Sequence, residues 1–287
     1  MKAIASVQRT NEILNKYGLR AKKGYGQNFI IDSNIVENIA LKSECEDACV
    51  IEIGPGIGAL TQMLCIHAKH VVAYEIDTKL LEVLSDTLSE YDNVEIINED
   101  FLNVDLDSVV ASLKKKYGKV VVCANLPYYI TTPILFKIFE ANNQVDCITV
   151  MMQKEVADRF SASVNSKDYN ALSVISQYLY DIKTIIKISR NIFNPKPNVD
   201  SAVVQFKIHD RANISDVNAF FELVKACFKQ RRKTIYNNLR EYVNDSEVAL
   251  RILDKSGIGT NTRAQQLSLD DFINLYGVFE DERKGIC

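Results

Sequence analysis

Short apolar runs alternate with helical stretches along the first half of the chain, and this alternation restricts the possible folds more than any other feature. The runs have the length and composition of buried strands and cover residues 49–53, 71–74, 94–97, 120–124 and 147–152. A stretch with helical spacing or polarity separates each run from the next. Strands that alternate with helices in this way predict an α/β fold with a doubly wound, mostly parallel, Rossmann-like sheet.

The pattern changes in the second half of the chain. Two stretches of alternating apolar and polar residues, 182–188 and 199–208, predict further strands, and a Pro-rich loop joins them. From residue 211 onward the apolar residues recur at helical spacing. We therefore predict a boundary near 209–212. It separates a sheet domain of residues 1–209, which includes an N-terminal arm, from a small all-helical domain of residues 210–287.

Composition excludes several classes of protein. No apolar run approaches the ~18 residues of a membrane-spanning helix, and the polar N-terminus does not have the pattern of a secretory signal. The seven cysteines are scattered through apolar runs, which favours a reducing, cytoplasmic environment over a disulfide framework. None of the three histidines has a partner at metal-ligand spacing, so no metal site is expected.

The net charge of −3 conceals two basic segments. Residues 1–26 hold six Lys or Arg and one Glu, and residues 225–240 hold six Lys or Arg and no acid. Such localised positive charge can form the footprint of a polyanion, although a solvated helix face is the favoured interpretation of either segment alone. The candidate nucleic-acid contacts are Lys22, Lys23, Lys225, Lys229, Arg231, Arg232 and Lys233.

The strand at 120–124 is followed by Asn125, Leu126, Pro127 and Tyr128. Proline lacks an N–H group and holds the residue before it in an extended conformation, so we expect the Leu126 carbonyl to face outward. This carbonyl and the Asn125 amide oxygen could bind an exocyclic amine while the flat base that carries it stacks on the Tyr128 ring. A plain loop that ends a strand explains these four residues equally well.

Gly54, Gly56 and Gly58 form a loop between a strand and a helix, where backbone N–H groups can meet an anionic or carboxylate-bearing ligand. We take Gly54 and Gly56 as candidate cofactor contacts. With Ala59 and Glu75, the loop also fits the dinucleotide fingerprint. A nicotinamide-dependent oxidoreductase is therefore a competing interpretation of the glycines.

The polar residues at the strand ends favour a different cofactor. Glu52, Glu75, Asp100 and Asn125 lie at or near the ends of four successive strands, and ligands of such sheets bind across the carboxyl ends of the strands. Glu75 is placed to bind two ribose hydroxyls, Asp100 to accept from an adenine amine, and Phe101 to pack on the adenine ring. Hydride transfer gives no reason for an amine-holding group beside them. Methyl transfer from S-adenosyl-L-methionine is the better explanation.

With these residues, the sequence resembles the ribosomal RNA adenine dimethyltransferases. The resemblance extends from Lys22 to about Tyr276. The motifs that carry the resemblance are Gly26-Gln27-Asn28-Phe29, Glu52-Ile53-Gly54-Pro55-Gly56-Ile57-Gly58, Asn125-Leu126-Pro127-Tyr128, Gln153-Lys154-Glu155-Val156-Ala157, Phe193-x-Pro195-x-Pro197-x-Val199-Asp200-Ser201, Arg231-Arg232-Lys233-Thr234 and Arg263-Ala264. The resemblance implies that a monomeric enzyme transfers two methyl groups to N6 of each of two adjacent adenines. These adenines lie near the 3′ end of small-subunit (16S) ribosomal RNA.

The resemblance also implies roles for single residues. Asn28 and Ile30 correspond to an arm that closes on the cofactor, and Phe193 to a second aromatic face for the target base. The other cofactor contacts that it implies are Gly54, Glu75, Asp100 and Asn125.

Tyr129 departs from the family, which usually has Asn there, and this predicts altered substrate packing rather than lost activity. Two related functions remain as alternatives. The macrolide-resistance methyltransferases of large-subunit RNA usually carry Ile-Pro-Tyr-Asn where this chain has Leu126-Pro127-Tyr128-Tyr129. The other alternative is a non-catalytic module for ribosome assembly or transcription on the same fold.

Overall fold

The computed structural model describes residues 2–19, 28–141, 145–209 and 213–285. Its contacts divide the chain into two compact units. The first unit combines Met1–Ala157 with Lys183–Ile208, and the second combines Asp158–Ile182 with His209–Cys287. The predicted contacts Lys22 and Lys23 lie outside the described residues.

Within the described residues, seven strands form one sheet in the order β4-β3-β2-β5-β6-β9-β7. Their bounds are β2 (Cys49–Ile53), β3 (His70–Tyr74), β4 (Val94–Ile97), β5 (Val120–Asn125), β6 (Cys147–Gln153), β7 (Tyr180–Ile188) and β9 (Ser201–Ile208). The pairs β3–β4, β2–β3, β2–β5 and β5–β6 are parallel, whereas β9 runs antiparallel to β6. The predicted α/β fold with a mostly parallel sheet is confirmed.

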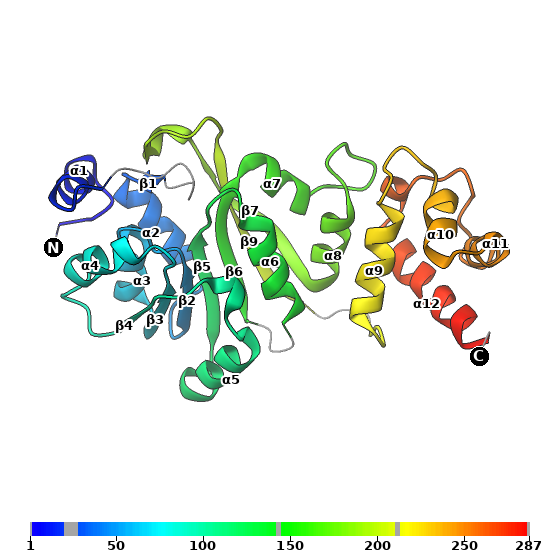
Figure 1. Cartoon of the computed structure of the whole chain (residues 1–287), viewed down its shortest axis with the longest axis horizontal. Coiled ribbons are helices and arrows are strands. Elements are labelled where there is room, and N and C mark those ends of the chain that lie inside the picture. Colours follow the sequence, from blue (N-terminus) through cyan, green and yellow to red (C-terminus); the bar gives the residue numbers. More distant parts are fainter. Residues whose placement is uncertain (1, 20–27, 142–144, 210–212, 286–287) are drawn as a thin grey trace. The chain divides into compact units, whose positions relative to one another are not determined.

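Helices alternate with these strands and flank the sheet (Figure 1). They are α2 (Ser33–Lys42), α3 (Ala59–His67), α4 (Thr78–Thr87), α5 (Leu106–Tyr117), α6 (Thr131–Glu140) and α7 (Lys154–Phe160), and α1 (Val7–Lys16) precedes them. Short 3-10 helices, η2 (Phe101–Asn103) and η3 (Arg190–Ile192), follow β4 and β7.

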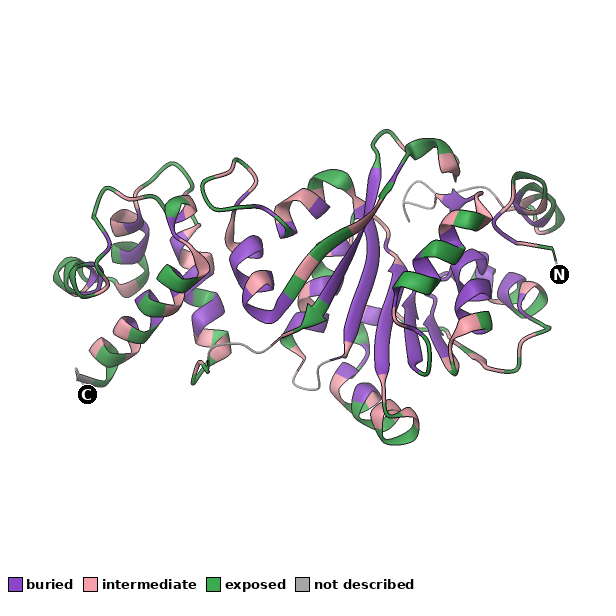
Figure 2. Cartoon of the chain, turned by 180° about the vertical axis from the view of Figure 1, so that it is seen from behind, coloured by how far each residue is buried: buried purple, intermediate pink, exposed green. Residues whose placement is uncertain are grey.

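Burial of the central strands explains why the sheet forms. Every residue of β2 is buried, and β5 is buried from Val120 to Ala124. Figure 2 shows the same burial along the central strands and exposed faces on the surrounding helices. Parallel strands covered on both faces require nearly continuous apolar sequence, and that is the pattern from which the strands were predicted.

Aspartate side chains begin several helices directly after the strands. Asp32 accepts hydrogen bonds from the backbone of Asn34 and Ile35 in α2, and Asp77 accepts one from Lys79 in α4. Such caps satisfy N–H groups that have no partner inside the helix. In α4 the cap fixes the chain two residues after Glu75, and thereby helps to position the end of β3.

A second, two-stranded antiparallel sheet joins β1 (Phe29–Ile30) to β8 (Phe193–Asn194). Phe29 pairs with Asn194 and Ile30 with Phe193. The sequence did not predict this pairing, because two residues are too few to show a period and the partners are far apart in the chain.

The second unit is formed mainly by α8 (Ala171–Leu179), α9 (Val217–Cys227), α10 (Ile235–Val243), α11 (Ser246–Lys255) and α12 (Leu269–Gly285), with the 3-10 helix η4 (Ala264–Gln266). Aromatic rings fill its core. Tyr169 packs on Phe228 and Tyr178 on Phe220, with ring centroids 6.0 and 5.1 Å apart. These contacts explain why residues 158–182 group with the C-terminal helices.

This grouping differs from the predicted split into residues 1–209 and 210–287, although the chain does pass between the units at Ile208 and His209. An apolar pattern in the sequence does not show which core a segment such as residues 158–182 joins. No helix in the described part of the chain is long and apolar enough to cross a membrane.

Candidate active site

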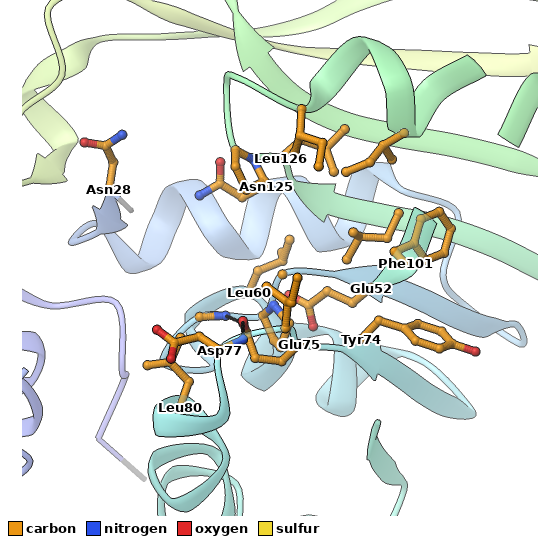
Figure 3. Close-up of a pocket in the computed structure, with 18 of the residues that line it drawn as sticks. Asn28, Glu52, Leu60, Tyr74, Glu75, Asp77, Leu80, Phe101, Asn125 and Leu126 are labelled. Carbon is orange, nitrogen blue, oxygen red and sulfur yellow. Dashed lines mark hydrogen bonds between the residues drawn. The ribbon is translucent and has the colours of Figure 1, made fainter. Parts of the chain in front are cut away.

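One pocket lies at the carboxyl ends of the parallel strands. Figure 3 shows how β2, β3, β5 and the segment after β4 contribute side chains to it. Every described residue that the sequence suggested for cofactor or base binding lines this pocket, namely Asn28, Ile30, Gly54, Gly56, Glu75, Asp100, Phe101, Asn125, Leu126, Pro127, Tyr128 and Phe193. The strand-end argument and the glycine loop predicted most of this set, and the family resemblance predicted Asn28, Ile30 and Phe193. The role of each residue stays a prediction.

The loop between β2 and α3 bends through left-handed backbone. Gly54 and Gly56 have φ angles of 69° and 62°, a region that residues with a side chain rarely adopt. A Cβ atom on Gly56 would also lie 3.7 Å from the Phe29 ring. Glycine at these positions lets the backbone pass close to the pocket and direct the Gly56 N–H group toward Glu75.

Glu75, directly after β3, is 5% exposed and is held by the backbone. Its Oε1 accepts from the Asp77 N–H at 2.8 Å, and its Oε2 accepts from the Gly56 N–H at 3.2 Å. Burial raises the pKa of the Glu75 carboxyl, and these two hydrogen bonds act in the opposite direction. A carboxylate oxygen that accepts one bond keeps a further lone pair, so Glu75 can still accept from two hydroxyls of a ligand.

Asp100 and Phe101 follow β4. The Asp100 side chain caps η2 by accepting from the Leu102 N–H at 3.0 Å. Phe101 is buried and packs edge-on against Tyr74, with ring centroids 5.6 Å apart. This arrangement places a carboxylate beside an apolar ring, a combination that suits an adenine and its amine.

The end of β5 is fixed by contacts with β6, α6 and β9. The Leu126 N–H donates to the Met151 carbonyl at 3.2 Å, and the Thr131 hydroxyl donates to the Pro127 carbonyl at 3.0 Å. The Tyr128 hydroxyl lies 2.7 Å from the hydroxyl of Ser201. Burial raises the pKa of the Tyr128 hydroxyl, so it stays protonated and can share this hydrogen bond.

The pocket lining also includes Tyr129, Asn28 and Phe193. Tyr129 is 58% exposed, whereas its neighbour Leu126 is buried. The pairing of β1 with β8 brings the arm that carries Asn28 next to Phe193, and a hydrogen bond from the Ile31 N–H to the Ile192 carbonyl extends this pairing. Phe193 itself is buried and belongs to the core of the first unit.

Two residues that hold side chains of the pocket escaped the sequence analysis. Ser201 appeared in the Phe193–Ser201 motif without a role, and only its position at the start of β9 shows that it holds Tyr128. Asp77 lines the pocket and donates its N–H to Glu75. An Asp at a helix start shortly after a strand was the available signal for it.

The pocket lining is strongly acidic. Its carboxyl side chains form what we call the acidic wall, which comprises Glu52, Glu75, Asp77, Glu99 and Asp100. Among the described lining residues there is no Lys, Arg or His. A pocket of this kind attracts a cation and repels the pyrophosphate of a dinucleotide. The other side of the pocket, the amide–aromatic wall, consists of Asn125, Leu126, Pro127, Tyr128 and Phe193.

The basic residues of the second unit lie on and after α9. Lys225 pairs with Glu222 and Lys229 with Glu241, at 3.0 and 2.6 Å. The Arg231 side chain donates to Gln265 and to the Lys167 carbonyl, whereas Arg232 and Lys233 are exposed. Residues 225–240 contain no acid, but the fold places Glu222 and Glu241 beside two of the lysines in this stretch.

Arg231, Arg232 and Lys233 lie in the turn after α9, which we call the basic turn. Asn238 holds this turn in place, because its side-chain amide donates to the carbonyls of Cys227 and Gln230, at 2.8 and 3.3 Å. No group of three or more His, Cys, Asp or Glu in the described part of the chain could hold a metal ion.

The parallel sheet, the left-handed glycine loop and the acidic pocket at the strand ends define an α/β protein that binds a cationic nucleoside cofactor. Comparisons with known proteins identify its family. Residues 18–281 match the sequence model of the ribosomal RNA adenine dimethylases. The chain is 46% identical to a ribosomal RNA small subunit methyltransferase A of Staphylococcus aureus (strain Newman), over 99% of this chain and 97% of that protein. A protein of the same name from strain JH9 is 45% identical over the same shares.

Solved structures show the same fold. A dimethyladenosine transferase from Plasmodium falciparum superposes with a TM-score of 0.74, at 24% identity, over 88% of this chain and 98% of that one. A 23S ribosomal RNA methyltransferase superposes with a TM-score of 0.66, also at 24% identity, over 88% of this chain and 100% of the other.

The chain belongs to the ribosomal RNA adenine dimethylase family. It is an S-adenosyl-L-methionine-dependent methyltransferase, which excludes the nicotinamide alternative. The pocket fits this cofactor, because the acidic wall matches its positive charge and the Glu75 carboxylate can bind hydroxyls. The cofactor supplies an electrophilic methyl group on a sulfonium sulfur.

Proposed function

We propose that this chain methylates N6 of two adjacent adenines near the 3′ end of small-subunit (16S) ribosomal RNA, and leaves both as dimethyladenosine. One observation carries the proposal. An acidic, cofactor-binding wall and the Asn125–Tyr128 end of β5 share a single pocket, in a chain 46% identical to a small-subunit ribosomal RNA methyltransferase. We further infer that the protein works as a monomer in the cytoplasm, during ribosome biogenesis.

The acidic wall holds the cofactor in this proposal. Glu75 binds the two ribose hydroxyls with the lone pairs that Gly56 and Asp77 leave available. Asp100 accepts from the adenine amine and Phe101 packs on the adenine ring. Asn28 and Ile30, on the arm joined to β8, close over the cofactor.

The amide–aromatic wall holds the target adenine. An aromatic amine is a weak nucleophile, because its lone pair is delocalised into the ring. Asn125 cannot act as a general base, since a carboxamide does not titrate in the working pH range. The Asn125 oxygen and the Leu126 carbonyl therefore act by position and polarity, and stabilise the positive charge that develops on N6 during in-line attack.

The adenine must leave its stack in the RNA to reach this wall, at an energetic cost of a few kcal/mol. Stacking on Tyr128 offsets that cost, and Phe193 is the second aromatic face. After the first transfer the amine keeps one hydrogen, so only one of the two acceptors is still used. The pocket must then accommodate a methyl group where the other hydrogen was.

RNA outside the target base is bound by positive charge. Lys225, Lys229, Arg231, Arg232 and Lys233 contact phosphates in this proposal, as do Lys22 and Lys23, which lie outside the described residues. Arg232 and Lys233 are exposed and have the freest access to a phosphate. Lys225 and Lys229 must exchange an acidic partner for the RNA.

Incubation with methyl-labelled S-adenosyl-L-methionine and unmethylated ribosomal subunits tests the choice of RNA. We expect label only in small-subunit RNA, at two adjacent adenines near its 3′ end. Label in large-subunit RNA would support the macrolide-resistance type of activity instead. Cofactor binding without label in either subunit would support the non-catalytic alternative.

A further inference from the structure

Glu52 is the most deeply buried acid of the pocket. It lies in β2, two residues before Gly54, and its side chain reaches the pocket lining. The residue is 1% exposed, and its Oε2 atom has no hydrogen-bond partner. Figure 3 shows Glu52 on the same side of the pocket as Glu75. A buried carboxylate with an unpaired oxygen is destabilised, so such a group normally stays protonated or binds a cation.

The described residues that face Glu52 carry no positive charge. Thr61 and Cys65 face it from α3, Cys123 from β5, and Glu75 from the end of β3. Ala73 is its neighbour in β3 across the strand pair. Burial, and to a lesser extent the negative charge of Glu75, raise the pKa of Glu52 to about 8, while the Thr61 hydroxyl acts in the opposite direction. The carboxyl is therefore mostly neutral at pH 7 in the empty pocket.

We propose that Glu52 senses the charge of the cofactor: its carboxyl is neutral in the empty pocket, and it releases its proton to solvent when cationic S-adenosyl-L-methionine binds. The remaining carboxylate faces a positive charge that the empty pocket lacks. The reaction product S-adenosyl-L-homocysteine carries a neutral thioether, so it does not favour the ionised form. Glu52 then binds the substrate cofactor more tightly than the product cofactor.

Proton linkage determines the magnitude of this selectivity for S-adenosyl-L-methionine over the product. Each pH unit by which a ligand lowers the pKa of Glu52 corresponds to about tenfold tighter binding to the ionised than to the protonated carboxyl. The product gains none of this stabilisation, because Glu52 takes up a proton again from solvent once the sulfonium charge has gone. The proposal concerns the cofactor alone, so its failure would leave the RNA substrate of the enzyme unaffected.

Calorimetry in buffers of different ionisation enthalpy measures the protons released per bound ligand. The probes are S-adenosyl-L-methionine and S-adenosyl-L-homocysteine, each titrated into wild type, Glu52→Gln and Glu95→Gln at pH 7. Glu95 is an exposed acid of β4 outside the pocket lining and serves as the matched control. Both ligands carry an α-amino group, which is mostly protonated at pH 7 and therefore contributes little to the difference between them.

We expect wild type and Glu95→Gln to release more protons on binding S-adenosyl-L-methionine than on binding S-adenosyl-L-homocysteine at pH 7. The excess should be about half a proton or more per bound molecule. In Glu52→Gln this excess disappears, and the preference for S-adenosyl-L-methionine over the product falls about twofold or more, which is the loss that corresponds to half a proton at pH 7 for a pKa of about 8. Equal proton release for the two ligands in the wild type, or an excess that survives in Glu52→Gln, would overturn the proposal.

A pH series on the wild type alone keeps the proposal testable if Glu52→Gln does not fold. With a pKa of about 8, the carboxyl of the empty pocket is already ionised at pH ~9.5. The excess proton release must therefore shrink toward zero between pH 7 and that value. An excess that persists unchanged at the higher pH contradicts the assignment.

Discussion

The two walls of the pocket are built in different ways. In the acidic wall, Glu75 is held by backbone N–H groups 19 and 2 residues away in the sequence. In the amide–aromatic wall, Tyr128 is held by the side chain of Ser201, 73 residues away. Glu75 is thus fixed by the loops that directly follow β2 and β3, whereas Tyr128 depends on a contact with the distant strand β9. We infer that the acidic wall sets cofactor affinity and that the amide–aromatic wall sets turnover.

Asn125→Ala tests this division with the largest expected effect. Loss of a preorganised polar group that stabilises the transition state reduces kcat by roughly 10²–10³-fold. Cofactor affinity should change only a few-fold, since Asn125 belongs to the other wall. Turnover on unmethylated small subunits and calorimetric Kd values measure the two quantities. The control is Asn34→Ala, at an exposed position in α2. A large rise in the cofactor Kd of Asn125→Ala would contradict the proposed roles of the two walls.

Glu75→Ala should produce the converse result. A hydrogen bond to a charged group contributes about 1.5–3 kcal/mol, so the Kd for S-adenosyl-L-methionine should rise by ~10- to 150-fold. At saturating cofactor, kcat should recover most of the wild-type value. Glu95→Ala on β4 removes the same charge outside the pocket. Unchanged affinity in Glu75→Ala, or tight binding of NAD to the wild type, would contradict the assignment.

The basic turn after α9 should affect RNA binding without affecting either wall. Each phosphate contact to single-stranded RNA contributes about −0.7 to the slope of log affinity against log salt. Replacement of Arg231, Arg232 and Lys233 by Ala should flatten this slope by ~2 and weaken RNA binding by roughly 10- to 100-fold near ~0.1 M salt. Lys114, Lys115 and Lys116 in α5 provide a triple-Ala control of equal charge. An unchanged slope would assign the turn to an ordinary solvated surface.

Ser201→Ala is expected to have the smallest effect. Loss of one neutral hydrogen bond, worth about 0.5–1.5 kcal/mol, should lower kcat by ~2- to 12-fold through misplacement of Tyr128, while the cofactor Kd stays unchanged. Restoration of the hydroxyl in Ser201→Thr should recover part of the loss. Ser43→Ala removes a buried hydrogen bond of the first unit outside the pocket. An equal loss of kcat in both Ala variants would mean that Ser201 contributes only to stability.

The same difference between the walls explains what the sequence could predict. The bounds of β2 and β4 agree with the predicted ones, because each strand has its own apolar pattern and a nearby turn or cap. The order of polar residues at the strand ends was also enough to gather Glu75, Asp100 and Asn125 into one pocket.

Contacts between distant segments could not be predicted in this way. The pairing of β1 with β8, the bond between Tyr128 and Ser201 and the grouping of residues 158–182 with the C-terminal helices all depend on the assembled tertiary structure. The sequence placed Glu52 before the glycine loop, but it could not show that the carboxyl is buried near Glu75 with one oxygen unpaired.

The number of methyl groups on the target adenines tests the central claim most directly. Unmethylated small subunits are treated with the enzyme and excess S-adenosyl-L-methionine, and the digested RNA is analysed by mass spectrometry. Because position and polarity rather than proton abstraction activate the amine, one remaining acceptor should suffice for the second transfer. We predict dimethyladenosine at two adjacent positions near the 3′ end as the end product. Accumulation of monomethyladenosine alone would contradict this account.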